Sequence, residues 1–330
     1  MKVSVIIPLF NAEKYLGECL QSLVIQTFAD FEVIVVDDCS TDNSVAVAEN
    51  FLERFGGRLK IISLPKNTGS GAVPRNEGLK FSRGEYVFFM DSDDLLAADA
   101  LEKLYGAAKS FRADVVHMNH GFICSEDLNP AKTVLAEWDK VPTPIDTPTL
   151  ETTDLSVRME KLLATAYGWA PWIKFLRRDF LIANDIKFPE LRISEDIVWT
   201  MELVFLAERW LTFPERLYTY RTSDNSMMRS RRSPEEEIKF WLDPLIKGVD
   251  FLDKFTGGLK FFLQNPNYRF EVTNFFVKIQ LAGMLGALDE LSNRELYEIF
   301  HRAFSKDGSK HAALIANLMV FMNFYRNKSR

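Results

Sequence analysis

The sequence predicts an α/β protein whose mainly parallel sheet is flanked by helices and followed by a C-terminal helical extension. In the first third of the chain, short runs of apolar and often β-branched residues alternate with amphipathic segments. Such alternation is typical of βαβ units, which form right-handed crossovers and a parallel sheet. After residue 233 the apolar residues recur at helical spacing, and Pro234 followed by three glutamates indicates a helix start.

Five apolar runs predict the strands of this sheet. The first two are nearly continuous and β-branched, as expected of strands that are buried on both faces. The runs lie at residues 3–8, 32–37, 59–64, 85–90 and 114–119.

Amphipathic segments between these runs predict helices. They lie at residues 12–26, 41–55 and 98–111. We expect Asn11 to cap the first helix. Residues 129–149 hold four prolines and four threonines, which predicts a loop or an edge connection. Residues 312–325 form an apolar run interrupted by two asparagines, which indicates a buried or interfacial helix.

Charge is unevenly distributed along the 330 residues. The net charge of −6 argues against a nucleic-acid partner. Residues 226–330 carry a net charge of +4, whereas the remainder carries −10. The helical extension is therefore expected to contact a membrane face, to form a homodimer, or to be an ordinary solvated helical surface.

The three cysteines form no CxxC pair, which suits a reducing cytosol and argues against a disulfide framework. The N-terminal apolar run is too short for a membrane span, and no cleavage site follows it. We therefore expect a cytoplasmic protein, either free or peripheral at the inner face of the membrane.

Polar residues follow three of the predicted strands, where an open parallel sheet binds its ligands. They include Asn11 after the first strand, Asp38 after the second, and the run Asp91-Ser92-Asp93-Asp94 after the fourth. No G-x-G-x-x-G motif follows the first strand, so a dehydrogenase-type dinucleotide site is not supported. Three carboxylates within four positions repel one another unless a cation or hydrogen-bond donors lie among them.

The ordered combination of these motifs resembles the family 2 glycosyltransferases of the Rossmann-like GT-A fold. The resemblance is carried by "VSVIIPLFNAEKYLGECLQSLVIQTFADFEVIVVDDCSTDNS", by "NTGSGAVPRNEGLKFSRGEYVFFMDSDD" and by "WIKFLRRDFLIANDIKFPELRISEDIVW". It covers residues 1–110 almost without gaps and resumes at residues 172–199.

The resemblance implies a GT-A domain at residues 1–225, with a nucleotide-binding half (1–110) and an acceptor-binding half (111–225), before the extension at 226–330. It also implies an inverting, metal-dependent hexosyltransferase. Such an enzyme moves a sugar from a UDP-sugar to a hydroxyl of a glycan or lipid-linked acceptor, in cell-surface polysaccharide synthesis.

Nucleotide recognition is expected of Asp38 and Arg75. A uracil ring needs an acceptor for its N3–H and donors for its carbonyls, which these side chains supply, and the family pattern implies similar work for them. Pro8, Phe10 and Asn11 would form the wall beside the base. An Asx turn or helix cap is the alternative for Asp38, although Asp42 or Ser40 fits that role better.

The D-x-D motif Asp91-Ser92-Asp93 is the expected metal and sugar site. Residues i and i+2 of a strand share a face, so both carboxylates can address one Mn²⁺ or Mg²⁺. The resemblance implies Asp93 as the main metal ligand, and Asp91 with Ser92 at the ribose or sugar. Asp94 is expected either to cap the helix at 98–111 or to touch the donor sugar.

The pair Glu195-Asp196 stands where the family has its general base. We expect Asp196 to take the proton of the acceptor hydroxyl, with Glu195 as its substitute or orienting partner. A helix N-terminus favours acids in the same way, with Ser194 as N-cap, and the two interpretations are compatible. Trp169 and Trp172 are expected either to stack on a sugar or, as aromatic residues usually do, to pack in the core.

Two other functions remain open from the sequence. A catalytically silent nucleotide-sugar-binding interaction protein would have no need of the D-x-D and Glu-Asp pairs. A sugar nucleotidyltransferase would have a glycine-rich basic loop after the first strand, which "PLFNAEKYL" lacks.

Overall fold

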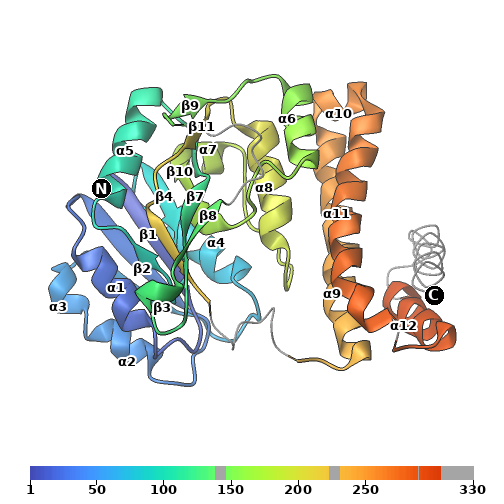
Figure 1. The fold of residues 1–330 in the computed structure, drawn as a ribbon, viewed down its shortest axis with the longest axis horizontal. Coiled ribbons are helices and arrows are strands. Elements are labelled where there is room, and N and C mark those ends of the chain that lie inside the picture. Colours follow the sequence, from blue (N-terminus) through green and yellow to red (C-terminus); the bar gives the residue numbers. More distant parts are fainter. Residues whose placement is uncertain (138–145, 223–230, 289, 306–330) are drawn as a thin grey trace. The chain divides into compact units, whose positions relative to one another are not determined.

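The computed structural model describes residues 1–137, 146–222, 231–288 and 290–305 (Figure 1). The chain divides into two compact units, residues 1–190 with 195–226, and residues 191–194 with 227–330. The helix predicted at residues 312–325 lies outside the described residues.

In the described residues the first unit contains an eight-stranded sheet and a four-stranded sheet. Their orders are β3-β2-β1-β4-β10-β6-β11-β9 and β5-β12-β7-β8. The strands are β1 (Val3–Leu9), β2 (Phe31–Asp37), β3 (Leu59–Ser63), β4 (Tyr86–Phe89), β5 (Leu95–Leu96), β6 (Val115–Met118), β7 (His120–Cys124), β8 (Val134–Glu137), β9 (Thr149–Leu150), β10 (Lys174–Arg177), β11 (Trp210–Phe213) and β12 (Tyr218–Arg221). The helices are α1 (Leu16–Val24), α2 (Ser44–Glu49), α3 (Leu52–Phe55), α4 (Ala72–Phe81), α5 (Ala100–Phe111), α6 (Leu155–Leu163), α7 (Arg178–Ala183) and α8 (Glu195–Leu206), with short 3₁₀ turns at Pro130–Lys132 and Pro171–Ile173.

The larger sheet is mainly parallel, as predicted. β1 lies parallel to β2 and β4, and β2 lies parallel to β3, whereas β10 runs antiparallel between β4 and β6. Because β2 and β4 lie on opposite sides of β1, the strand order reverses there. The carboxyl ends of β1, β2 and β4 therefore meet at a topological switch point, where such sheets bind ligands.

The central strands are buried on both faces, which explains their continuous apolar runs. Val5 and Ile7 belong to one core cluster with Leu20 of α1 and Leu104 of α5. Ile6 is equally buried but lies outside that cluster, because successive side chains of a strand point to opposite faces. Helices therefore have to cover both sides of the sheet (Figure 1).

Local structure differs from expectation at Asn11. The first helix begins at Leu16, not beside Asn11, and Asn11 does not cap it. Asn11 has a φ of 47°, and its Oδ1 accepts a hydrogen bond from Thr41 N at 2.7 Å. In the region predicted as a loop or edge connection, the described residues contribute β8 and β9, which lie at the edges of the two sheets as predicted, whereas residues 138–145 lie outside the described residues.

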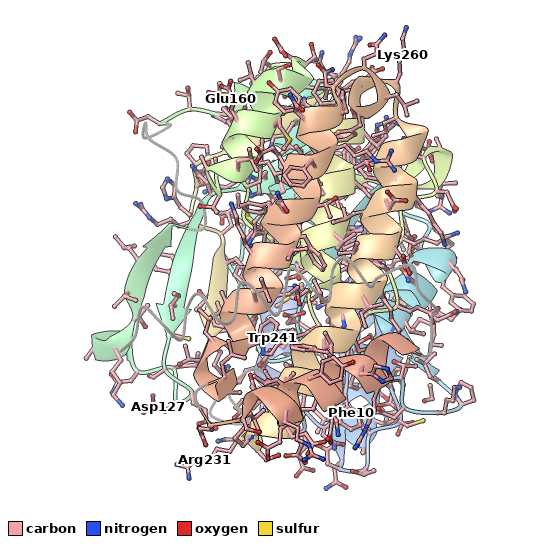
Figure 2. The ribbon with its side chains drawn as sticks, turned by 90° about the vertical axis from the view of Figure 1, so that its right-hand side faces the viewer. Phe10, Asp127, Glu160, Arg231, Trp241 and Lys260 are labelled. Atoms are coloured by element: carbon pink, nitrogen blue, oxygen red, sulfur yellow. The ribbon has the colours of Figure 1, made fainter. Side chains whose placement is uncertain are left out.

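The second unit is helical, with α9 (Pro234–Gly258), α10 (Lys260–Gln264), α11 (Pro266–Leu288) and α12 (Asn293–Ser305). α9 begins where predicted, in a capping box formed by Ser233 and Glu236. α9 and α11 run side by side (Figure 2). They pack so closely that a Cβ on Gly283 would lie 2.2 Å from Cε2 of Trp241. Within the described residues, every helix is too short or too polar to cross a membrane.

Glu202 of α8 makes stability depend on pH. Its side chain is buried, Oε2 has no hydrogen-bond partner among the described residues, and burial followed by the nearby Asp185 raises its pKa to about 8. The native state thus holds a proton that the unfolded chain, with a pKa near 4.5, releases. This contribution to stability is therefore lost as the pH rises from 4.5 to about 8.

We expect Glu202→Gln, which is neutral at every pH, to raise the melting temperature clearly at pH 8 and little at pH 5. Thermal unfolding across this range measures the effect. The exposed Glu208→Gln is the matched control and should change neither value. An unchanged pH dependence in Glu202→Gln would contradict the expectation.

Candidate active site

Arg75 of α4 joins the two acidic motifs of the sequence. Its Nη2 lies 2.9 Å from Oδ1 of Asp91, and its Nη1 lies 3.1 Å from Oε1 of Glu195. Burial lowers the pKa of Arg75, but the carboxylates of Asp91 and Glu195 raise it, with a net upward shift. The guanidinium therefore stays charged and compensates two acids that are 104 positions apart in the chain.

Close packing holds this guanidinium in place. A Cβ on Gly71 would lie 2.6 Å from Nη1, so a side chain at that position would collide with it. On another side the guanidinium carbon lies 5.3 Å from the ring centroid of Phe188. The glycine at position 71 thus leaves room for the guanidinium of Arg75. Gly69, two residues earlier, has a left-handed φ of 76°, which glycine adopts readily.

The acids after β4 have different surroundings. Asp94 is fully buried, and its carboxylate accepts hydrogen bonds from Tyr218 Oη at 2.6 Å and from Arg221 N at 2.8 Å. Burial, followed by Asp93 and Asp91, raises its pKa well above the ordinary value. The expectation that Asp94 caps the next helix is therefore wrong, whereas its contact with the donor sugar stays a prediction. Asp99 occupies the N-cap position of α5.

Within the described part of the chain, the carboxylate of Asp93 accepts no hydrogen bond from any side chain. Burial, followed by the neighbouring Asp91, raises its pKa to about 6. A desolvated carboxylate of this kind is stabilised by a cation, so Asp93 fits a divalent metal that prefers oxygen ligands.

A complete metal cage is not preformed. The described residues contain no group of three or more His, Cys, Asp or Glu side chains arranged to hold an ion. The donor set that fits a metal is therefore Asp93, with Asp91 beside it. Mg²⁺-type sites usually bind through one or two carboxylates and complete the shell with phosphates and water.

Glu195 and Asp196 lie in the first turn of α8. Burial and then Asp196 raise the pKa of Glu195 to about 7, although Arg75 opposes the shift. Burial raises the pKa of Asp196, against the lowering effects of Arg75 and Lys174. Glu195 is held by Arg75, whereas Oδ1 of Asp196 accepts from the adjacent Ile197 N at 2.9 Å.

Lys174 supports this end of the site. Its Nζ is buried and donates to the carbonyl oxygens of Gly168, Trp169 and Ala170 at 2.6, 3.2 and 3.0 Å. The sequence contains a signal for it, a single lysine within the apolar run "WIKFL", but the residue pattern alone does not single it out.

Trp172 packs in the core, which is the second of the two interpretations offered for it. Its ring stacks on Tyr218 at a centroid distance of 4.6 Å and on Tyr220 at 5.5 Å. Trp169 is half-buried, and its carbonyl oxygen accepts from Thr200 Oγ1 at 3.1 Å.

Asp38 lies at the carboxyl end of β2. Its buried carboxylate accepts from the backbone N of Thr68 at 2.9 and 3.0 Å and from Thr68 Oγ1 at 3.0 Å. The Asx contact is made instead by Asp37, which accepts from Ser40 N at 3.0 Å. Asp42 similarly accepts from Ser44 N at 3.0 Å, beside the start of α2.

The residues after β1 lie next to this segment. Asn11 N donates to Ser40 Oγ at 3.0 Å, and Asn11 Oδ1 accepts from Thr41 N. Pro8 pairs in register with Val36 of β2. Phe10 is 50% exposed, so a large apolar ring stands at the surface beside the ends of β1 and β2.

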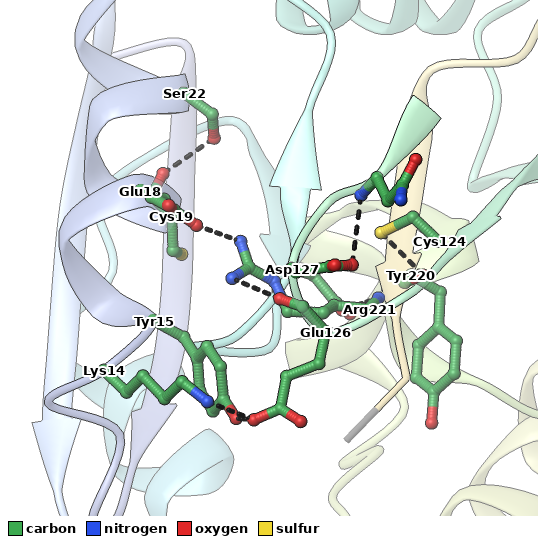
Figure 3. A network of polar contacts seen from close by, with 12 residues as sticks. Lys14, Tyr15, Glu18, Cys19, Ser22, Cys124, Glu126, Asp127, Tyr220 and Arg221 are labelled. Atoms are coloured by element: carbon green, nitrogen blue, oxygen red, sulfur yellow. Dashed lines mark hydrogen bonds and ion pairs between the residues drawn. The ribbon is translucent and has the colours of Figure 1, made fainter. Parts of the chain in front are cut away.

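Arg221, at the end of β12, anchors a polar network (Figure 3). Its buried guanidinium pairs with Glu18 of α1, and Nη1 donates to the carbonyl oxygen of Glu126 at 3.4 Å. Lys14 and Tyr15 also bond the Glu126 carboxylate. The network connects α1 and the segment after β7 to β12, the strand whose residues bond the Asp94 carboxylate.

Comparison with known proteins places this geometry in a family. The chain matches the family model described as Glycosyl transferase family 2 over residues 4–156. It is 30% identical over 239 residues to the uncharacterized glycosyltransferase YibD of Escherichia coli K12, covering 72% of this chain and 67% of that protein.

A second relative is the poly(ribitol-phosphate) β-N-acetylglucosaminyltransferase TarS of Staphylococcus aureus MW2. The identity is 32% over 289 residues, which are 85% of this chain. They are 47% of TarS, so the chain spans about half of that relative's length.

Solved structures show the same fold. TarS residues 1–349 in complex with UDP-GlcNAc superpose with a TM-score of 0.64 at 24% identity, over 99% of this chain and 92% of that chain. The mannosyltransferase PcManGT of Pyrobaculum calidifontis, in complex with GDP-Man and Mn²⁺, gives 0.50 at 16% identity, over 97% and 84%.

The fold is therefore the GT-A fold, as predicted. The chain belongs to glycosyl transferase family 2. The predictions of this family and of a glycosyltransferase enzyme are confirmed.

Arg75→Met removes the cation that the buried Glu195 and the partly buried Asp91 share. We expect the free energy of unfolding to fall by about 3–5 kcal/mol at pH 8, because an uncompensated charge is left buried. The loss should be smaller at pH 5.5, since Glu195, with a pKa of about 7, is then protonated.

Urea unfolding at the two pH values measures this difference. Lys103→Met, which breaks exposed pairs with Asp99 and Glu215, is the control and should cost less than about 1 kcal/mol. Equal losses at both pH values would contradict the role given to Glu195.

Proposed function

We propose that this chain transfers a sugar from a UDP-sugar to a hydroxyl of a glycan or lipid-linked acceptor, with inversion, in cell-surface polysaccharide synthesis. The observation that carries the proposal is the bridge from Asp91 through Arg75 to Glu195, at 2.9 and 3.1 Å. It brings a metal-type motif and an acid pair to one site at the switch point of the sheet.

Asp38, Arg75 and the wall of Pro8, Phe10 and Asn11 would bind the nucleotide. Thr68 already donates to both carboxylate oxygens of Asp38, but a carboxylate has about four acceptor sites and can also take a uracil N3–H. The UDP-GlcNAc complex of staphylococcal TarS supports a uridine donor and makes UDP-GlcNAc the first sugar to test.

Asp93 and Asp91 would hold Mn²⁺ or Mg²⁺, with Ser92 and Asp91 near the ribose or sugar. A bound divalent cation would offset the charge of the diphosphate as it leaves. The Mn²⁺ in PcManGT is in keeping with this choice of cofactor.

Asp196 would act as the general base. Its raised pKa makes it a stronger base than an exposed aspartate, and Glu195 is already engaged by Arg75. One acid at the donor and another at the acceptor suit a single displacement, which inverts the anomeric centre and needs no covalent intermediate.

The division of labour along the chain is part of the same proposal. Residues 1–110 would bind the nucleotide and 111–225 the acceptor, as halves of one domain at residues 1–225. The extension at 226–330, with its net charge of +4, would contact the inner face of the cell membrane or form a homodimer.

A panel of UDP-sugars tested with Mn²⁺ examines the proposal directly. We expect release of UDP with at least one donor, first as slow hydrolysis and faster when a glycan acceptor is added. Binding of UDP without turnover of any donor would instead favour a catalytically silent nucleotide-sugar-binding protein.

Asp196→Asn should lower kcat by about 100- to 10,000-fold, the usual share of general-base catalysis. The Kd for UDP should stay unchanged, because Asp196 makes no contact with the nucleotide in this scheme. Asp179→Asn is the matched control, since Asp179 also lies in the first turn of a helix but is 84% exposed. Undiminished transfer by Asp196→Asn would reject its role.

Asp93→Asn should weaken Mn²⁺ binding by at least about 100-fold, since even outer-shell changes cost about 10- to 100-fold. In the wild type, Mn²⁺ affinity should fall as the pH drops below 6, because a proton competes for the Asp93 carboxylate, whose pKa is about 6. Titration calorimetry with Mn²⁺ and UDP measures both effects. Asp99→Asn should retain wild-type affinity, and equal binding by Asp93→Asn would rule out the metal role.

A further inference from the structure

The hydroxyl of Tyr218 lies between two residues of the D-x-D segment. It donates to Asp94 Oδ2 at 2.6 Å and accepts from the backbone N of Asp91 at 3.3 Å. One buried side chain on β12 thus contacts both ends of the four-residue run that contains Asp93. Neither contact is visible in the sequence, because 127 positions separate Tyr218 from Asp91.

The same strand holds the segment at two more points. Arg221 N donates to Asp94 Oδ1 at 2.8 Å, so both carboxylate oxygens of Asp94 are bonded to β12. β5 begins directly after Asp94 and pairs antiparallel with β12, with Tyr218 opposite Leu96. The backbone from Asp91 to Leu96 is therefore fixed along one four-residue strand.

Packing leaves the Tyr218 ring little freedom. The ring is fully buried and stacks on Trp172, with an interplanar angle of 8°. Phe88 of β4, the strand that leads into the D-x-D motif, meets it edge-on at 6.2 Å. A ring packed on these sides determines where its hydroxyl stands.

We propose that Tyr218 is a positioning residue, which acts through Asp94 and the Asp91 backbone to hold the Asp91 and Asp93 carboxylates in a metal-binding arrangement. The inference rests on the proposed function. Three neighbouring carboxylates repel one another, and an unrestrained segment would separate them. By bonding Asp94 into the core, Tyr218 turns one acid into a structural support and leaves Asp93 open for a cation.

Tyr218→Phe removes the hydroxyl and keeps the ring stacking. We expect the Kd for Mn²⁺ to rise by about 10- to 100-fold, the usual cost of losing an outer-shell partner. The Kd for UDP without metal should be unchanged. Calorimetry measures both, and circular dichroism confirms the fold.

Tyr86→Phe is the matched control. Tyr86 is also buried and stacked, on Phe175, and lies on the strand leading to the motif, but its hydroxyl makes only 3.4 Å contacts with backbone carbonyls. It should lose a comparable amount of thermal stability and retain the wild-type Kd for Mn²⁺. Equal weakening of Mn²⁺ binding in the two variants would overturn the proposal, because the effect would then be general.

Variants of Asp94 test the route through which Tyr218 acts. Asp94→Ala should weaken Mn²⁺ binding as Tyr218→Phe does, and the double variant should be no weaker than the worse single one, because the pair acts as a unit. Asp94→Asn keeps an acceptor oxygen for Tyr218 and should restore much of the affinity. If Tyr218→Phe fails to fold, the comparison of Asp94→Ala with Asp94→Asn still tests the proposal.

The outcomes separate this inference from the proposed function. If Asp93→Asn abolishes Mn²⁺ binding while Tyr218→Phe and Asp94→Ala bind as the wild type does, the positioning role is overturned and the metal role stands. If the wild type itself binds no Mn²⁺ in the presence of UDP, the proposed function fails, and this inference fails with it.

Discussion

The buried guanidinium of Arg75 lies between carboxylates from two segments of the chain, Asp91 after β4 and Glu195 at the start of α8. Burying acids is costly unless a cation or hydrogen-bond donors accompany them, and here one cation accompanies two. The absence of a side chain at Gly71 leaves room for the guanidinium between these carboxylates. Without the bridge, the buried carboxylate of Glu195 would lose the cation that compensates its charge.

Given that constraint, the remaining acids divide into distinct roles according to their surroundings. Both carboxylate oxygens of Asp94 accept hydrogen bonds from β12. Asp93 has a pKa raised to about 6 and no side-chain donor among the described residues, so a cation would stabilise its carboxylate. The same residue type, repeated within four positions, thus performs different work because each copy meets a different part of the fold.

Much of the fold followed from local pattern. The five apolar runs correspond to β1, β2, β3, β4 and β6. Continuous burial on both faces demands such runs in the inner strands, whereas the edge strand β3 keeps Lys60 and Ser63 exposed. The start of α9 followed from a capping box and a proline, which act within four residues. The error at Asn11 has a physical cause: its side chain bonds the loop after β2, about 30 positions away, instead of its own helix.

The sequence by itself determined the strand ends, the D-x-D and Glu-Asp pairs and the family, because these depend on neighbours in the chain or on ordered motifs. Only the tertiary structure decided that Arg75 bridges the two pairs, that Tyr218 and Arg221 bond the buried Asp94, and that the charge of Lys174 acts on Asp196. These facts depend on contacts across long stretches of chain, and burial by distant segments is what changes the charge and the freedom of a side chain.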